Sequence, residues 1–88
     1  MDINLPAIEL FGDESVISLN EEGKRMAESG EMSKAEEAFL KAIESDHAYP
    51  PSYQNLGIIQ AAQSKTQEAV QSFEKLIELE PDKAGHYA

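Results

Sequence analysis

Apolar residues recur every three or four positions in four consecutive stretches of the chain, and a turn motif separates each stretch from the next. The first stretch runs from Val16 to Gly30, and the second follows Ser33 and ends at the motif "HAYPP". The third begins with the prolines of that motif and is broken by "QSKTQ", and the fourth stops before Pro81. Such spacing places the apolar side chains on one face of a helix. The pattern therefore predicts an all-α fold.

Residues near the expected helix ends fit this division. Ser33 and Glu36 form an S-x-x-E pattern, which predicts a capping box at the start of the second helix. Pro50 and Pro51 suit the first turn of the third helix, where a backbone N–H has no partner within the helix. Residues 1–15 contain a proline and a glycine and show no sustained period, so we expect a short N-terminal extension there.

The two halves of the helical region are copies of each other. Residues of the same type stand 34 positions apart at several sites. These pairs are Gly23 and Gly57, Ala27 and Ala61, Ala35 and Ala69, Phe39 and Phe73, Lys41 and Lys75, Ile43 and Ile77, and Glu44 and Glu78. We expect the glycines and Ala35 and Ala69 where two helices cross closely, and the phenylalanines beside those crossings. A helix pair cannot bury its apolar face alone, so neighbouring pairs should stack.

This period and these residue types resemble those of the tetratricopeptide repeat (TPR) family. The family follows the pattern W-x2-L-G-x2-Y, then A-x3-F, then P. The second copy reads Y-x2-L-G-x2-Q from Tyr53, then A-x3-F from Ala69, then Pro81. The first copy reads L-x2-E-G-x2-M from Leu19, then A-x3-F from Ala35. The resemblance implies antiparallel helix–turn–helix repeats that stack as a TPR-like α-solenoid.

The resemblance also divides the chain into an N-terminal extension, residues 1–15, and a TPR-like repeat domain, residues 16–88. Two repeats, 16–49 and 50–83, would be followed by the first residues of a third. The departures from the family pattern are Glu22 for a leucine, Gln60 for an aromatic residue, Ser64 for a turn glycine and His47 for the closing proline. These departures suggest irregular packing at the start of the stack, or a docked N-terminal segment that changes what those positions face.

TPR domains usually bind peptides or helices on a concave face lined by the first helix of each repeat, and the resemblance identifies that face here. The predicted partner-binding residues are Ile17, Asn20 and Lys24 from the first repeat and Gln54, Asn55 and Ile58 from the second, with Glu28 and Ala62 on the same face. Amide side chains can hold the backbone of an extended peptide through paired donors and acceptors. The alternative interpretation is a solvated helix face with one stray isoleucine.

The function that the resemblance implies is a protein–protein interaction module, an adaptor or scaffold without chemistry of its own. One alternative is a co-chaperone module that clamps the C-terminal carboxylate of chaperone tails. Asn55 matches one clamp position, but Asn20 stands where a lysine is expected and Lys24 where an asparagine is expected. Another alternative is that the chain is the N-terminal fragment of a longer TPR protein.

Composition narrows the class of partner. The chain has 88 residues and a net charge of −10, which repels phosphate, so we expect neither nucleic acid nor an anionic membrane as a ligand. The chain has no cysteine, which excludes disulfides and thiolate zinc sites. Residues 1–23 lack the lysine or arginine of a signal peptide or presequence. We therefore expect a soluble cytoplasmic protein with a protein or peptide partner.

The sequence offers no catalytic constellation, so we expect no enzymatic activity, no cofactor and no metal. It contains no Ser-His-Asp spacing, no glycine-rich phosphate loop and no HExxH motif. His47 lies near Asp46 and Glu44, a set that could in principle form a weak metal site. A solvated loop histidine is the preferred interpretation.

The outer side of the fourth helix, near Val70 and Ile77, is expected to lack the cover that a third repeat would give. The N-terminal extension carries large apolar residues that would be a liability if they were exposed. These are Ile3, Leu5, Ile8, Leu10 and Phe11. Either the extension or a second copy of the chain could cover the fourth helix. We therefore predict a weak homodimer, which the net charge of −10 opposes.

Overall fold

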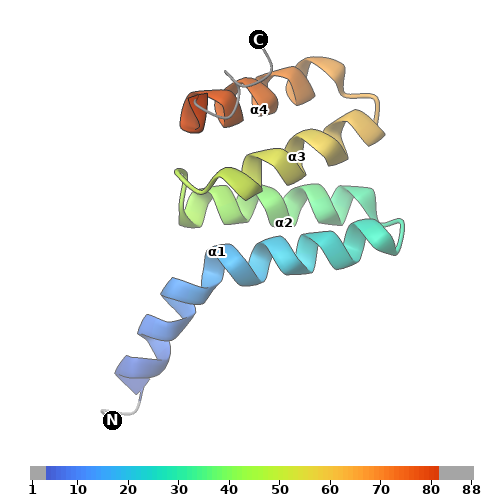
Figure 1. Ribbon diagram of the computed structural model, residues 1–88. Helices are drawn as coiled ribbons and strands as arrows, with labels where there is room; N and C mark the ends of the chain where they lie inside the picture. Colours follow the sequence, from blue (N-terminus) through green and yellow to red (C-terminus); the bar gives the residue numbers. More distant parts are fainter. Residues whose placement is uncertain (1–3, 82–88) are drawn as a thin grey trace.

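The chain folds into four α-helices that lie one above the other (Figure 1). The computed structural model describes the backbone of residues 4–81 and the side chains of residues 16–81, and over this range it contains no strand. The helices are α1 (Asn4–Glu28), α2 (Met32–Ser45), α3 (Pro50–Ala62) and α4 (Thr66–Leu79). This architecture confirms the predicted all-α fold class.

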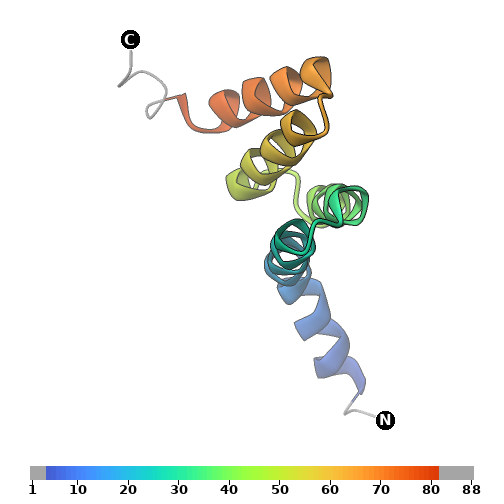
Figure 2. The ribbon, with the colours of Figure 1, turned by 90° about the vertical axis from the view of Figure 1, so that its right-hand side faces the viewer.

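The helices form two antiparallel pairs, α1 with α2 and α3 with α4. Contacts between α2 and α3 join the two pairs, and within the described residues α4 packs on α3 alone. In the side view α2 is seen end-on, whereas α4 is seen along much of its length (Figure 2). The second pair is therefore rotated relative to the first, as in a stack of helix–turn–helix repeats.

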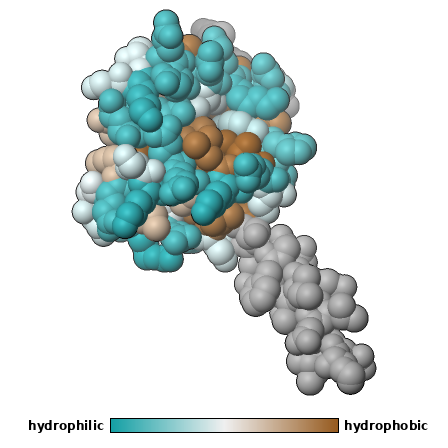
Figure 3. Space-filling view, turned by 180° about the vertical axis from the view of Figure 1, so that it is seen from behind, coloured by the Kyte–Doolittle hydropathy of each residue, from teal (hydrophilic) through white to brown (hydrophobic). Residues whose placement is uncertain are grey.

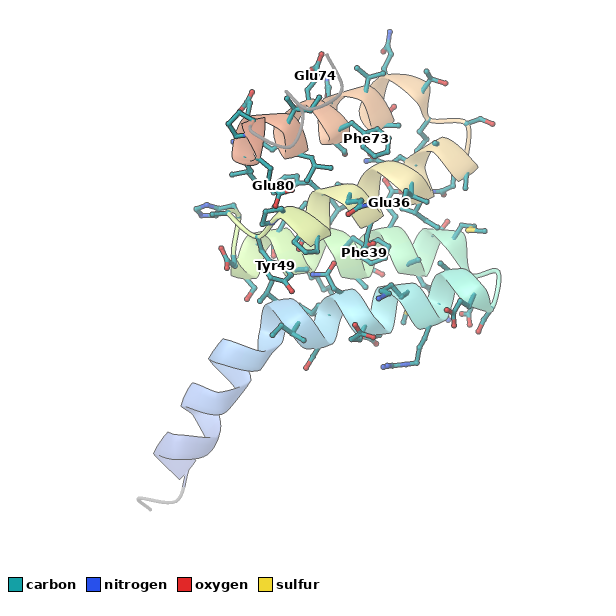
Figure 4. All side chains as sticks on the ribbon, viewed as in Figure 1. Glu36, Phe39, Tyr49, Phe73, Glu74 and Glu80 are labelled. Carbon is teal, nitrogen blue, oxygen red and sulfur yellow. The ribbon has the colours of Figure 1, made fainter. Side chains whose placement is uncertain are left out.

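Each pair is joined at a close helix crossing that only a small residue permits. Gly23 and Gly57 are both buried. A Cβ atom at Gly23 would lie 2.8 Å from Phe39 Cδ1, and one at Gly57 would lie 2.7 Å from Phe73 Cε1. Each phenylalanine lies between the two helices of its own pair (Figure 4). The structure thus confirms where the sequence placed the glycines and the phenylalanines.

The core lies where the first pair meets α3. It consists of Ala35, Phe39, Leu56 and Ile59. Partly buried residues of α1 and α2 pack around it, namely Met26, Ala27, Met32 and Ile43. Fully burying an aliphatic or aromatic side chain of this size stabilises a fold by about 1.5–3 kcal/mol. The packing of these few residues therefore holds the two pairs in register, and it forms the floor beneath the surface described below.

The first helix is longer than the sequence predicted. The periodic pattern begins at Val16, but α1 begins at Asn4 and continues without a break to Glu28. Pro6 stands in the first turn of α1, where its missing N–H has no partner within the helix in any case. Gly12 lies in the helix interior, where glycine costs only about 1 kcal/mol relative to alanine. The side chains of the predicted apolar extension lie outside the described residues.

The predicted capping box is wrong. The structure starts α2 at Met32 with Glu31 as its N-cap residue, and no side chain forms a cap hydrogen bond there. The Glu36 carboxylate instead accepts hydrogen bonds from residues of α3 and of the α3–α4 turn, which include a lysine (Figure 4). The bond to Lys65 joins two charged groups, whereas a capping box would pair the carboxylate with an uncharged backbone N–H. The long-range contacts of Glu36 therefore take the place of the capping box that was predicted with Ser33.

The turns within the two pairs share an unusual backbone conformation. Gly30 has φ = 84° and Ser64, 34 positions later, has φ = 65°. Left-handed backbone suits glycine because it has no Cβ atom, whereas serine adopts it at a cost. The departure from the family's turn glycine at Ser64 therefore changes the residue type without changing the fold of the turn.

Candidate functional site

Asn20, one of the predicted binding residues, is committed to the interior of the protein. Its side chain is buried, and its Nδ2 donates to the Val16 carbonyl oxygen and to Ser52 Oγ, both at 2.8 Å. Asn55 Nδ2 in turn donates to Asn20 Oδ1 at 3.0 Å. This network joins α1 to α3 below the surface. No local sequence pattern indicates this network, because Asn20 and Ser52 are 32 residues apart.

Above this network, α1 and α3 border a shallow hollow. Its lining residues are Lys24, Ala27 and Glu28 from α1, Phe39 from α2, and Asn55, Ile58 and Ile59 from α3. The hollow has a volume of about 210 Å³. We call it the α1–α3 hollow. Its floor is apolar and belongs to the core, so an inserted side chain would contact Phe39 and Ile59.

The structure brings together three of the six predicted binding residues at this hollow, namely Lys24, Asn55 and Ile58. Gln54 and Ile17 are exposed but do not line it. Asn20 lies beneath the surface, where its amide is already occupied. The sequence therefore placed several of these residues on the two helices that border the hollow, but it did not separate the surface residues from the buried one.

The charged side chains of Lys24 and Glu21, beside the hollow, are exposed and form only a weak ion pair. Lys24 Nζ lies 3.5 Å from Glu21 Oε2, and both side chains are more than half exposed. Exposed ion pairs of this kind are worth about 0–1 kcal/mol. Lys24 therefore remains available to a ligand, but it is a single hydrated cation rather than part of a charged cluster.

Helix α3 carries no charged residue, although charged residues make up 27% of the chain. The exposed side of α3 is consequently uncharged along its whole length. We call this surface the α3 stripe, and it consists of Pro51, Gln54, Ile58, Ala61 and Ala62. Ile58 lies at the centre of the α3 stripe, and its exposed fraction is 55%. The lack of charge on α3 can be read from the sequence, although it is not part of the repeat pattern.

Apolar exposure alone does not single out this face. On the side opposite to the view of Figure 1, an apolar area is ringed by hydrophilic side chains (Figure 3). Exposed large apolar residues also occur on α2, at Leu40, and on α4, at Val70 and Ile77. The α1–α3 hollow and the α3 stripe together form a surface that we call the α1–α3 face. It differs from these places in combining an exposed isoleucine, a hollow and an uncharged helix.

The strongest electrostatic feature lies away from the hollow, at Glu36. Its carboxylate accepts hydrogen bonds from Lys65 Nζ at 2.8 Å, Gln63 Nε2 at 2.7 Å and Gln60 Nε2 at 3.4 Å. Burial raises the pKa of Glu36, but the hydrogen bonds and the charge of Lys65 outweigh it and hold the pKa below its ordinary value of 4.5. The bond to Glu36 raises the pKa of Lys65. This group fastens α2 to the α3–α4 turn, and the Glu36 carboxylate is engaged there rather than at the hollow.

Among the described residues no three His, Cys, Asp or Glu side chains come together as metal ligands. The Asp46 carboxylate accepts a hydrogen bond from the Ala48 backbone N–H within the same loop. None of the helices within the described residues combines the length and the apolar character that a membrane crossing requires.

One comparison with known proteins identifies the repeat. Residues 38–71 match the family described as tetratricopeptide repeat. The match begins within α2, includes the whole of α3 and ends within α4, so it covers the junction between the two helix pairs. No curated protein and no solved structure gives a significant match to the chain. The four helices are consistent with two helix pairs of this family.

Proposed function

We propose that this chain, a tetratricopeptide-repeat protein and hence in general a protein-interaction module, is an adaptor that binds a peptide or helix of a partner on its α1–α3 face. The expected partner segment is uncharged along its contact line and carries a large apolar side chain. Lys24 stands at one edge of the hollow, where it can meet a partner carboxylate or carbonyl oxygen. The proposal assigns the chain no reaction of its own.

The observation that carries this proposal is the α3 stripe. The centres of protein interfaces are depleted of charged residues and their rims are polar. In a chain with a net charge of −10, a helix with no charge on its exposed side has the composition of an interface centre. The charged residues of α1, including Lys24 and Glu28, would then form the rim.

The volume of the α1–α3 hollow fits the insertion of one apolar side chain of the partner. The hollow of about 210 Å³ is smaller than a drug-sized ligand site, which has about 300–1,000 Å³, but it has room for one large side chain. Ile58 and Ala27 line its sides, and Phe39 and Ile59 lie in its floor. A leucine, isoleucine or phenylalanine of the partner would therefore be seated against apolar atoms.

The co-chaperone alternative finds less support at this face. A carboxylate clamp needs several cations and free amides. Among the residues that line the hollow, Lys24 is the only cation, while the Asn20 and Asn55 amides bond to each other. We therefore keep the general adaptor as the proposed function.

A selection experiment tests the proposal. The intact chain would be used to select binders from a phage-displayed library of random peptides, and the selected peptides would be measured by isothermal titration calorimetry. We expect apolar residues to be enriched and Ile58→Asp to weaken binding at least tenfold. Leu40→Asp is the matched control, because Leu40 is similarly exposed, at 46%, on α2. Peptides that bind the Ile58→Asp variant as tightly as the unchanged chain would refute the proposed face.

We also propose that the chain associates weakly with a second copy of itself when no other partner is present. The exposed Val70 and Ile77 offer an apolar contact between two copies. Each copy carries a charge of −10, so the contact is opposed by long-range repulsion. A weak homodimer that strengthens with salt is the expected form.

A further inference from the structure

The outer face of α4 differs from the equivalent face of α2, and the 34-residue period makes the two comparable. Position 36 on α2 corresponds to Val70 on α4, and Ile43 corresponds to Ile77. On α2 both positions face the second pair: Glu36 bonds to the α3 end and turn, and Ile43 packs against the core. The same face of α4 therefore lies where another helix would continue the stack.

Val70 and Ile77 are two exposed apolar residues on that face, and together we call them the α4 strip. They are seven residues apart, which is two helical turns, so both side chains lie on the same side of α4. Their exposed fractions are 49% and 50%. Within the described residues α4 contacts only α3 and lies at the end of the stack (Figure 1).

An acidic row borders the strip. Glu74 and Glu78 are both exposed and stand one turn apart on α4. Figure 4 shows Glu74 on the side of α4 that points away from α3. Glu78 Oε1 lies 3.5 Å from Lys75 Nζ, an exposed pair that neutralises little of the row. At the equivalent places on α2, Leu40 stands in place of Glu74 whereas Glu44 corresponds to Glu78, so only the Glu74 end of this row is specific to α4.

We infer that the α4 strip is a second docking site, separate from the α1–α3 face, and that its occupant is a basic amphipathic helix of another protein. The apolar side of such a helix would cover Val70 and Ile77, as α3 covers the corresponding face of α2. Its lysines or arginines would lie along Glu74 and Glu78. A helix laid into an apolar groove is a recurrent form of recognition.

Charge decides between this occupant and a second copy of the chain. Two copies bring charges of −10 together and would place one acidic row near the other. A basic helix reverses the sign of that interaction while burying the same apolar strip. We therefore expect a basic helix to displace self-association rather than to add to it.

The experiment uses the intact chain and two synthetic helical peptides. Both peptides carry the same leucine stripe, and one has lysine at every flanking position where the other has glutamate. Fluorescence anisotropy would measure their dissociation constants at low and high salt. We expect the lysine peptide to bind at least tenfold more tightly than the glutamate peptide at low salt, and this preference to shrink at high salt.

Matched variants separate docking from general attraction between opposite charges. Val70→Asn with Ile77→Asn keeps the net charge and should weaken lysine-peptide binding at least tenfold, whereas Ile58→Asn should not. Glu74→Gln with Glu78→Gln should weaken it more than Glu37→Gln with Glu44→Gln, which removes the same charge from exposed positions on α2.

Three results would overturn the inference. One is binding that both pairs of charge variants weaken equally, because the attraction would then be unspecific. Another is sedimentation that shows a dimer which the lysine peptide does not dissociate, because a second copy would then hold the strip. The third is a large loss of thermal stability in the Val70→Asn, Ile77→Asn variant of the free chain, because the chain itself would then cover the strip.

Discussion

Replacing Glu36 by glutamine tests how the two helix pairs are fastened together. The Glu36 side chain is only 13% exposed, and it accepts two short hydrogen bonds and one long one from residues that follow in the chain. Hydrogen bonds to a charged group are worth about 1.5–3 kcal/mol each. Glutamine keeps one acceptor oxygen and the shape of the side chain, and Lys65 is partly exposed to water. We therefore expect a net loss of about 1–2 kcal/mol.

Thermal unfolding followed by circular dichroism would measure this loss. A change of 1 kcal/mol shifts the Tm of a domain of this size by about 4–8 °C, so we expect the Tm to fall by roughly 5–15 °C at neutral pH. Glu37→Gln is the matched control, because Glu37 is exposed on the same helix. Its Tm should change by little, since surface substitutions are usually within about 0.5 kcal/mol of neutral.

The pH dependence gives the sign of the effect. The folded pKa of Glu36 lies below its ordinary value of 4.5, so the unfolded chain takes up the proton first as the pH falls. The stabilisation from the carboxylate is therefore complete above the unfolded pKa and is lost as the pH falls through the folded pKa. The Tm difference between the unchanged chain and Glu36→Gln should shrink below pH 4.5. Equal Tm values at neutral pH, or a difference that persists in acid, would refute this reasoning.

Three further predictions concern the core, a turn and the oligomeric state. Phe39→Ala should leave a cavity and lower the free energy of unfolding, measured in urea, by about 3–5 kcal/mol, whereas Phe73→Ala should lower it less because Phe73 is partly exposed. Equal losses would contradict the difference in burial between the two phenylalanines. Ser64→Gly should raise the free energy of unfolding by roughly 0.5–1 kcal/mol because it relieves a left-handed serine, and a lower Tm would contradict this. The chain alone should sediment as a weak dimer that tightens at high salt as screening relieves repulsion; association that weakens with salt would exclude the homodimer.

Much of the fold could be predicted because its determinants are repeated in the sequence. Gly23 and Gly57 mark the close crossings, and Phe39 and Phe73 mark the space beside them, at the same spacing of 34 residues. The length of α1 could not be read in this way. Pro6 and Gly12 are ordinary helix-ending residues, but near a helix start and as a single interior glycine they are tolerated.

The candidate site was predictable only in part, because its decisive contacts are long-range. Asn20 has an amide side chain that could bind a peptide, yet this side chain is buried and donates a hydrogen bond to Ser52. Glu36 stands three residues after Ser33, as in a capping box, yet its carboxylate accepts a hydrogen bond from Lys65, which lies 29 positions away. Neither partner can be inferred from local pattern. The uncharged α3 stripe, in contrast, could be read from the sequence alone once the exposed side of the helix is known.

A residue-resolved NMR titration of the intact chain with a peptide selected against it would locate the binding face. We expect the largest amide shifts along the α1–α3 face, at Lys24, Gln54 and Ile58, while the amide signals of Val70 and Ile77 on α4 remain unchanged. Shifts confined to α2 or α4, with the α3 stripe unaffected, would contradict this expectation.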